Sequence, residues 1–194
     1  MPFSGFVEGA KAAPLGEARG RMVYGSSLTG AMISPWPRLS RLVSNPNFRV
    51  LPAGTPDAEA LATLHATAFG RGWSTEEFER LLIERNVVAD RALAGRRTAG
   101  FAISRIAADQ AEILSVAVAS RDRRRGLARK LLDVHLGRLA GYGVGSVFLE
   151  VDEGNAAARR LYAGLRFVQV GRRDRYYTDT DGTGTALVLR RDLP

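Results

Sequence analysis

The chain has 194 residues, the size of one domain, and its composition of 45% apolar and 25% charged residues is typical of a globular protein with a buried core. It contains no Cys, which excludes a disulfide framework, a Cys metal site and a Cys nucleophile, and it contains no apolar run long enough to cross a membrane. The net charge of +8, carried almost entirely by Arg, favours anionic partners such as phosphates, nucleic acid or an acidic surface.

Residues 1–46 differ from the rest because Gly, Pro and Ser interrupt every possible element. All three Met residues, Met1, Met22 and Met32, lie in this stretch. Two interpretations stay open: translation starts at Met22 or Met32, or the stretch is a flexible extension. N-terminal sequencing of the native protein distinguishes them. We find no secretory signal there, and we expect a cytoplasmic protein whose domain covers residues 47–194.

Regular patterning begins with a short strand at residues 48–51. Thr55 and Pro56 then predict a helix start, with Thr55 as the N-cap and Pro56 at the first helical position. Apolar residues at helical spacing give this helix a buried side, formed by Leu61, Leu64 and Phe69.

The second helix has the clearest local signal in the chain. Ser74 and Glu77 have capping-box spacing, and Trp73 and Phe78 have the spacing of a hydrophobic staple. We expect a helix that ends near Asn86 and buries Phe78, Leu81 and Leu82.

Three strand-like runs at residues 87–94, 98–106 and 111–119 follow, and the short polar breaks between them predict an antiparallel meander. The pattern then becomes helical from Leu127 to Gly141, with one line of residues at 127, 131, 134 and 138 and a second apolar line at 132, 136 and 139. A strand at 146–152, a helix at 155–165 and strands at 167–171 and 185–190 complete the order. The predicted fold is a mixed, mostly antiparallel sheet flanked by helices, in the α/β or α+β class.

The strand at 115–118 leads through a short linker into a basic glycine turn that opens the long helix. A helix N-terminus presents unpaired N–H groups and the positive end of the dipole, and Gly126 allows close approach of an anion. Arg123 to Arg125 add charge, whereas Ala128 keeps the approach open. The alternative is a solvated Arg run before an ordinary helix. Neither the G-K-S/T of a nucleoside-triphosphate loop nor a dinucleotide G-x-G-x-x-G occurs here.

Residues 111–167 resemble the acetyl-CoA-binding core of the GCN5-related N-acetyltransferase superfamily. Its hallmark Q/R-x-x-G-x-G/A, between a strand and a helix, is matched by Arg123, Gly126 and Ala128. The resemblance extends over about residues 47–193 and is greatest to the ribosomal-protein-alanine N-acetyltransferases. Four further passages carry it: Phe69-Gly70-Arg71-Gly72-Trp73-Ser74; Leu149-Glu150-Val151; Asn155-Ala156-Ala157-Ala158 with Leu161-Tyr162; and Arg172-Arg173-Asp174-Arg175-Tyr176-Tyr177 before Asp181-Gly182.

The resemblance implies acetyl-CoA as cosubstrate, no metal, and transfer to a protein N-terminus, possibly that of a ribosomal protein beginning with alanine. It implies Glu150 as general base and Tyr162 as general acid. It further implies cofactor contacts from Val116, Ala117 and Val118, from Arg123, Arg124, Arg125, Gly126, Leu127, Ala128 and Arg129, and from Asn155. The acidic stretch Asp152-Glu153-Gly154 departs from the usual subfamily loop, which bears on the acceptor.

The residue types agree with acetyl transfer to an amine. The pKa of an α-amine lies near about 8, so a carboxylate can take its proton, and a phenol with a pKa near about 10 can protonate a leaving thiolate. Strand alternation turns Glu150 away from the apolar face of 146–152. Alternatively, Glu150 is a solvent-facing carboxylate and Tyr162 is a core residue.

Trp73, Tyr176 and Tyr177 are candidate residues of the acceptor entrance, although Trp73 also fits a helix staple and the tyrosines fit a packed strand pair. His65 and His135 are expected to be ordinary, half-buried helix residues. Two other functions stay open: acetylation of a small amine, and nucleic-acid binding by the cluster at 121–129. The latter lacks the interleaved aromatics of a stacking platform, so no specific nucleic-acid partner is expected.

Overall fold

The computed structural model describes residues 48–69, 71–174 and 184–194. The described part contains seven strands, four α-helices and two short 3-10 turns. In chain order these are β1 (Phe48–Pro52), η1 (Thr55–Asp57), α1 (Ala58–Ala68), α2 (Thr75–Ile83), β2 (Val87–Ala94), β3 (Arg97–Ala107), β4 (Gln110–Val118), η2 (Ser120–Asp122), α3 (Leu127–Gly141), β5 (Ser146–Asp152), α4 (Ala156–Gly164), β6 (Val168–Arg173) and β7 (Ala186–Asp192).

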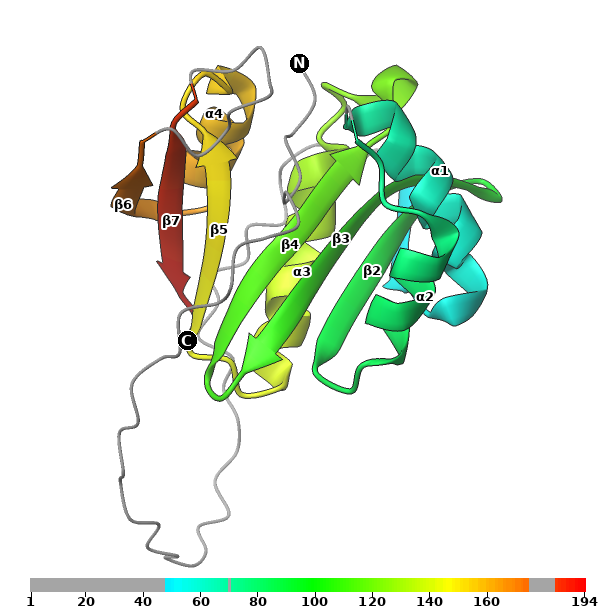
Figure 1. Cartoon of the computed structure of the whole chain (residues 1–194), viewed down its shortest axis with the longest axis horizontal. Coiled ribbons are helices and arrows are strands. Elements are labelled where there is room, and N and C mark those ends of the chain that lie inside the picture. The colour runs from blue at the N-terminus through cyan, green and yellow to red at the C-terminus, as the bar shows by residue number, and fades with distance from the viewer. Residues whose placement is uncertain (1–47, 70, 175–183) are drawn as a thin grey trace, which may run out of the picture. The chain divides into compact units, whose positions relative to one another are not determined.

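The strands form one sheet in the order β1-β2-β3-β4-β5-β7-β6, in which every neighbouring pair is antiparallel except β4 and β5. This confirms the predicted mixed, mostly antiparallel sheet, including the meander β2-β3-β4. The parallel pair is short, because only residues 110–112 of β4 align with residues 146–148 of β5. Beyond that point the two strands diverge (Figure 1), so among the described strands the second half of β4 has no neighbour along this edge.

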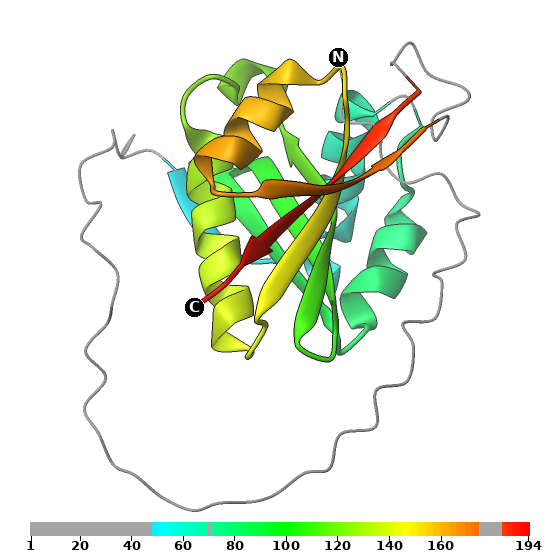
Figure 2. The same ribbon diagram turned by 90° about the vertical axis from the view of Figure 1, so that its left-hand side faces the viewer.

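Helices cover both faces of the sheet. Figure 2 shows α3 and α4 on one side and α1 and α2 on the other. Val116 and Val118 belong to the core cluster that contains the buried residues of α3 and α4. Ala117, between them, belongs to the cluster under α1 and α2. Alternation along β4 therefore gives each helical layer its own apolar surface.

The start of α1 differs from the prediction. Thr55 is not the N-cap, because the chain first makes the 3-10 turn η1 after Gly54. The Asp57 carboxylate accepts a hydrogen bond from the Gly54 N–H at 3.0 Å, and the Asp57 N–H donates to the Gly54 carbonyl at 2.8 Å. The buried side formed by Leu61, Leu64 and Phe69 is confirmed.

The predicted capping box of α2 is confirmed. The Ser74 hydroxyl accepts from the Glu77 N–H at 3.2 Å, and the Glu77 carboxylate accepts from the Ser74 N–H at 2.6 Å. The rings of Trp73 and Phe78 lie 5.4 Å apart, as the staple requires. The helix ends at Ile83, earlier than the expected Asn86, and of its residues only Phe78 is fully buried.

In α3 the buried stripe follows residues 127, 131, 132, 135, 136 and 139. Val134 was expected to continue one of the predicted lines but is 38% exposed, because a stripe of period 3.6 passes through His135 instead. His135 is fully buried rather than half-buried. Its Nδ1 lies 2.7 Å from the Asp90 carboxylate and its Nε2 lies 2.7 Å from the Ser104 hydroxyl. Arg138 pairs with the other oxygen of Asp90 at 2.9 Å, so this network joins α3 to β2 and β3.

Candidate active site

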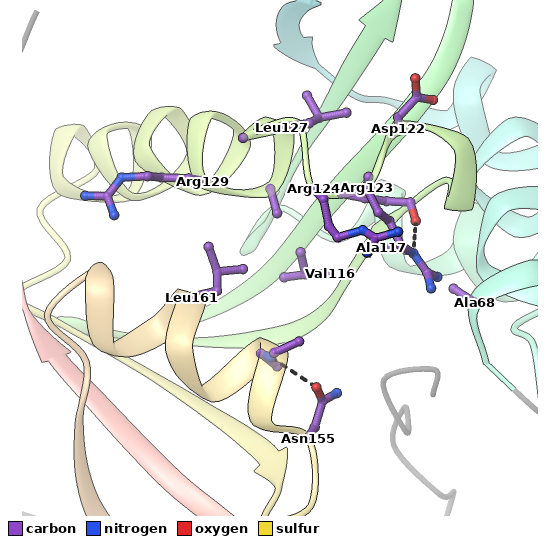
Figure 3. Close-up of a pocket in the computed structure, with 15 residues that line it drawn as sticks. Ala68, Val116, Ala117, Asp122, Arg123, Arg124, Leu127, Arg129, Asn155 and Leu161 are labelled. Atoms are coloured by element: carbon purple, nitrogen blue, oxygen red, sulfur yellow. Dashed lines mark hydrogen bonds between the residues drawn. The ribbon is translucent and has the colours of Figure 1, made fainter. Parts of the chain in front are cut away.

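A pocket of about 330 Å³ lies beside the divergent half of β4 (Figure 3). Its walls come from β4, the turn before α3, the first half of α4 and the end of α1. All the residues predicted to contact the cofactor line it, except Arg125. The pocket also contains residues that sequence reasoning missed: Ala68, Asp122, Ala157, Ala158 and Leu161. Apart from Asp122, these are apolar. Ala157, Ala158 and Leu161 belong to a passage that carries the family resemblance, but no cofactor contact was predicted for them.

The turn before α3 presents its backbone N–H groups to this pocket. Arg124 and Gly126 both have left-handed backbones, with φ of 58° and 77°, and such turns form concave N–H nests for anions. Among the described residues, the N–H groups of residues 124–129 find no acceptor, and the first helical bond runs from the Lys130 N–H to the Gly126 carbonyl at 3.1 Å. The positive end of the α3 dipole, together with Arg123, Arg124 and Arg129 on the wall, makes this end of the pocket suitable for phosphate.

The free edge of β4 supplies a second set of backbone groups. The Ala119 N–H bonds to β3 through the Ala99 carbonyl at 2.9 Å, whereas the Val118 carbonyl accepts from Arg123 Nε at 3.0 Å. Backbone groups of an antiparallel strand point alternately toward and away from the neighbour. Val116 and Val118 therefore turn their N–H groups toward the open edge, where they are available to an extended ligand.

Arg125 is held away from the pocket. Its guanidinium lies 5.1 Å from the centre of the Phe48 ring and 3.4 Å from the Asp122 carboxylate. Asp122 is buried and also pairs with Arg97 at 2.8 Å. The carboxylate on the pocket wall is thus neutralised by two arginines outside the lining set, and Arg125 contributes at most its backbone N–H to the site.

Glu150 lies on β5, on the face opposite to α3 and α4. Its neighbours Val147, Leu149 and Val151 are in the α3 and α4 core, so alternation turns Glu150 toward the layer of α1 and α2, as predicted. The side chain is only 14% exposed, and its Oε1 pairs with Arg173 at 3.0 Å. Its Oε2 is buried and accepts no hydrogen bond within the described residues. A buried carboxylate oxygen without a donor is a ready acceptor for an ammonium group or a water molecule.

A second carboxylate, Glu112, lies close to Glu150, and sequence reasoning missed it. Glu112 on β4 aligns with Phe148 on β5, two residues before Glu150. Partial burial raises the pKa of Glu112, with the negative charge of Glu150 as the next cause. The sequence shows that Glu112 alternates with buried residues along β4. It does not show that Glu112 lies near Glu150, because that requires β5 to be the neighbour of β4.

Tyr162 is buried in α4, with its ring 5.7 Å from that of Phe167. Burial raises the pKa of its phenol well above the ordinary value, so the hydroxyl keeps its proton at neutral pH. The packing alternative for Tyr162 and the proton-donor role are compatible, because a buried phenol can fill the core with its ring and donate with its hydroxyl.

Of the three residues predicted to form the acceptor entrance, the structure describes only Trp73. Trp73 is half-buried beside the end of α1 and stacks on His65 with ring centres 4.8 Å apart. Tyr176 and Tyr177 lie outside the described residues. Within the described part of the chain, no cluster of His, Cys, Asp and Glu suited to a metal ion occurs, and no helix is long and apolar enough to cross a membrane.

Comparison with known proteins agrees with this geometry. The sequence profile of the acetyltransferase (GNAT) family matches residues 58–167. The ribosomal protein bS18-alanine N-acetyltransferase of Escherichia coli K12 is 33% identical over 135 residues, which cover 70% of this chain and 90% of that enzyme.

Two solved structures illustrate the likeness in three dimensions. The crystal structure of the ribosomal-protein-S18-alanine N-acetyltransferase from Escherichia coli superposes with a TM-score of 0.70 at 29% identity, covering 75% of this chain and 93% of that one. Arabidopsis thaliana NAA60 in complex with acetyl-CoA gives a TM-score of 0.65 at 20% identity, over 75% of this chain and 98% of that one. The second likeness shows the shared fold alone.

Proposed function

The chain belongs to the acetyltransferase (GNAT) family, and from that premise we propose that it transfers the acetyl group of acetyl-CoA to the N-terminal α-amine of a protein. The acceptor class we propose is a ribosomal protein that begins with alanine. The observation that carries this proposal is the 33% identity to the Escherichia coli enzyme over 90% of that enzyme's length. The pocket and carboxylate described above support the same chemistry.

The residues of the pocket fit acetyl-CoA. The N–H groups of residues 124–129 and the side chains of Arg123, Arg124 and Arg129 would hold the diphosphate. Gly126 leaves open space where a Cβ would stand, so the backbone can approach the phosphates closely. The open edge at Val116 to Val118 would hold the pantetheine arm by backbone hydrogen bonds, and Asn155 borders the same pocket from the α4 side. Acetyl-CoA supplies an activated thioester.

Proton removal falls to Glu150. An α-amine with a pKa near about 8 is largely protonated at neutral pH and must lose a proton before it can attack a carbonyl. Oε2 of Glu150, which has no donor among the described residues, would accept that proton, directly or through one water molecule. Arg173, paired with Oε1, orients the carboxylate. Glu112 beside it adds a second carboxyl group to this side of the site.

The remaining steps are assigned to a strand amide and to Tyr162. A β4 N–H group would stabilise the negative charge on the thioester oxygen as the C–N bond forms. The Tyr162 phenol would give its proton to the sulfur as the C–S bond breaks. The chain has no Cys, so we propose direct transfer with both substrates bound rather than an acyl-Cys intermediate.

We further propose that the catalytic domain covers residues 47–194 and that the protein acts in the cytoplasm, where ribosomal proteins are made. The main alternative within the family is acetylation of a small free amine. The two acceptor classes differ in what must fit against the α1 and α2 side of the site, namely a peptide backbone or a compact amine.

The test is incubation of the full-length chain with acetyl-CoA and a panel of acceptors, with product detection by mass spectrometry. The panel contains peptides beginning with Ala, matched peptides with a blocked α-amine and an internal Lys, and free polyamines and amino acids. We expect acetylation of the Ala peptides only. Transfer to free amines without transfer to any peptide would overturn the proposal.

A further inference from the structure

His65 belongs to α1, three residues before its end, and its ring contacts the short segment that joins α1 to α2. Its side chain is fully buried, and its Nδ1 accepts the backbone N–H of Trp73 at 2.9 Å. A ring nitrogen that accepts a hydrogen bond carries no proton, so the imidazole is neutral with its hydrogen on Nε2. Nε2 is itself buried and has no hydrogen-bond partner within the described residues.

The same ring is stacked between the two ends of the segment. Its centre lies 4.2 Å from that of Phe69, which follows α1, and 4.8 Å from that of Trp73, which precedes α2. Phe78 meets the ring edge-on at 5.7 Å. One side chain therefore contacts both Phe69 and Trp73, and the capping box of α2 begins at the next residue, Ser74.

This segment borders the acceptor side of the site. Ala68, the last residue of α1, lines the pocket, so the segment starts at the pocket wall. Trp73 packs against the same core cluster as Ala117 of β4, on the α1 and α2 side of the sheet. Glu150 faces that side too, whereas the diphosphate end of the pocket lies at α3. The acceptor must therefore approach from the side where this segment stands.

Packing alone does not account for a histidine here. A buried donor without a partner costs on the order of 1–3 kcal/mol, and a phenylalanine would fill the same aromatic cluster without that cost. What the imidazole adds is the acceptor for Trp73. The protein tolerates the free-energy cost of an unpaired buried N–H in order to make this one hydrogen bond. We infer from this that the position of Trp73 is important.

We propose that His65 is a positioning residue for the acceptor substrate: it holds Trp73 in place as part of a preformed wall against which the peptide binds. The inference rests on the proposed function, since it concerns the acceptor of that reaction. His65 touches no reacting atom in this account and acts only through Trp73.

The test compares two substitutions at His65 in the full-length chain. His65→Phe keeps the ring stack but deletes the acceptor, whereas His65→Asn carries an amide oxygen that can take the place of Nδ1. We expect His65→Phe to raise the KM for an Ala-initiated peptide by about fivefold to tenfold, as loss of a buried hydrogen bond allows, and to leave the KM for acetyl-CoA unchanged. His65→Asn is expected to recover most of the peptide affinity.

The matched control is His135→Asn, at an equally buried histidine on the α3 side of the sheet. It is expected to lower the unfolding temperature but to leave both KM values unchanged. If His65→Phe does not fold, Trp73→Leu must show the same selective rise in peptide KM. A His65→Phe variant with wild-type peptide KM, or with equal rises for both substrates, would overturn the role of His65. A wild-type chain that acetylates no peptide would instead overturn the proposed function.

Discussion

The buried His65 makes the stability of the protein depend on pH in a way that can be calculated. Burial lowers the pKa of His65 from 6.5 to about 4, while Glu77 opposes the shift. In the unfolded chain the imidazole takes up its proton near the ordinary value, so the unfolded state binds more protons between these two pH values. The stability that neutral His65 provides is therefore complete above the unfolded pKa and is lost as pH falls toward the folded one.

The magnitude follows from the two pKa values. At ~1.4 kcal/mol for each tenfold difference in proton affinity, the full effect is about 3 kcal/mol, of which about 2 kcal/mol is lost between about pH 7 and about pH 4.5. Urea unfolding of the wild type and of His65→Phe at both pH values measures it. Apart from Glu77, which interacts with His65, the carboxylates keep the same surroundings in both proteins, so the difference between their pH dependences is due mainly to His65. Equal losses of stability in the two proteins would refute the reasoning.

Three further predictions concern the site and the core. Glu150→Gln and Tyr162→Phe should each lower kcat about 100-fold or more, as loss of a general base or acid does, with acetyl-CoA affinity by calorimetry near the wild-type value; wild-type kcat in both would contradict their roles. Gly126→Ala places a Cβ on a backbone with a φ of 77°, which costs roughly 1 kcal/mol, and this Cβ would face the phosphates. The KM for acetyl-CoA should therefore rise, and an unchanged KM would argue against the diphosphate site. Asp90→Ala removes the carboxylate that His135 and Arg138 share. Loss of this buried partner should lower the unfolding free energy, measured by urea titration, by about 3 kcal/mol or more. A loss below about 1 kcal/mol would show that the network is not needed for stability.

Local sequence signals predicted the elements and the anion-binding turn before α3, and the family resemblance pointed to most of the other residues that line the pocket. Most of the proposed cofactor residues lie on one continuous strand, turn and helix at residues 115–129. Their proximity therefore follows from the local sequence and does not depend on the rest of the fold. Asn155 was proposed from the family resemblance alone, and the structure adds that its side chain accepts the Ala158 N–H at 3.0 Å as the N-cap of α4. The staple of Trp73 and Phe78 was predicted because its two residues are five positions apart.

The features that were missed are those that depend on distant contacts. The divergence of β4 from β5 and the approach of Glu112 to Glu150 require the strand order, which no local pattern contains. Arg125 was assigned to the cofactor with its neighbours, but Phe48 and Asp122 hold its side chain elsewhere. His135 was expected to be an ordinary helix histidine, and its partners Asp90 and Ser104 lie on two strands far from it in sequence.

The central claim is that the cleft beside β4 delivers an acetyl group to the N-terminal amine of a ribosomal protein. Intact-mass spectrometry of ribosomal proteins from a strain that lacks this gene, beside its parent, tests it most directly. The account predicts that one protein with an N-terminal alanine loses the mass of a single acetyl group in the deletion strain, and that the wild-type gene, but not Glu150→Gln, restores it. Identical masses for every ribosomal protein in the two strains would contradict the account.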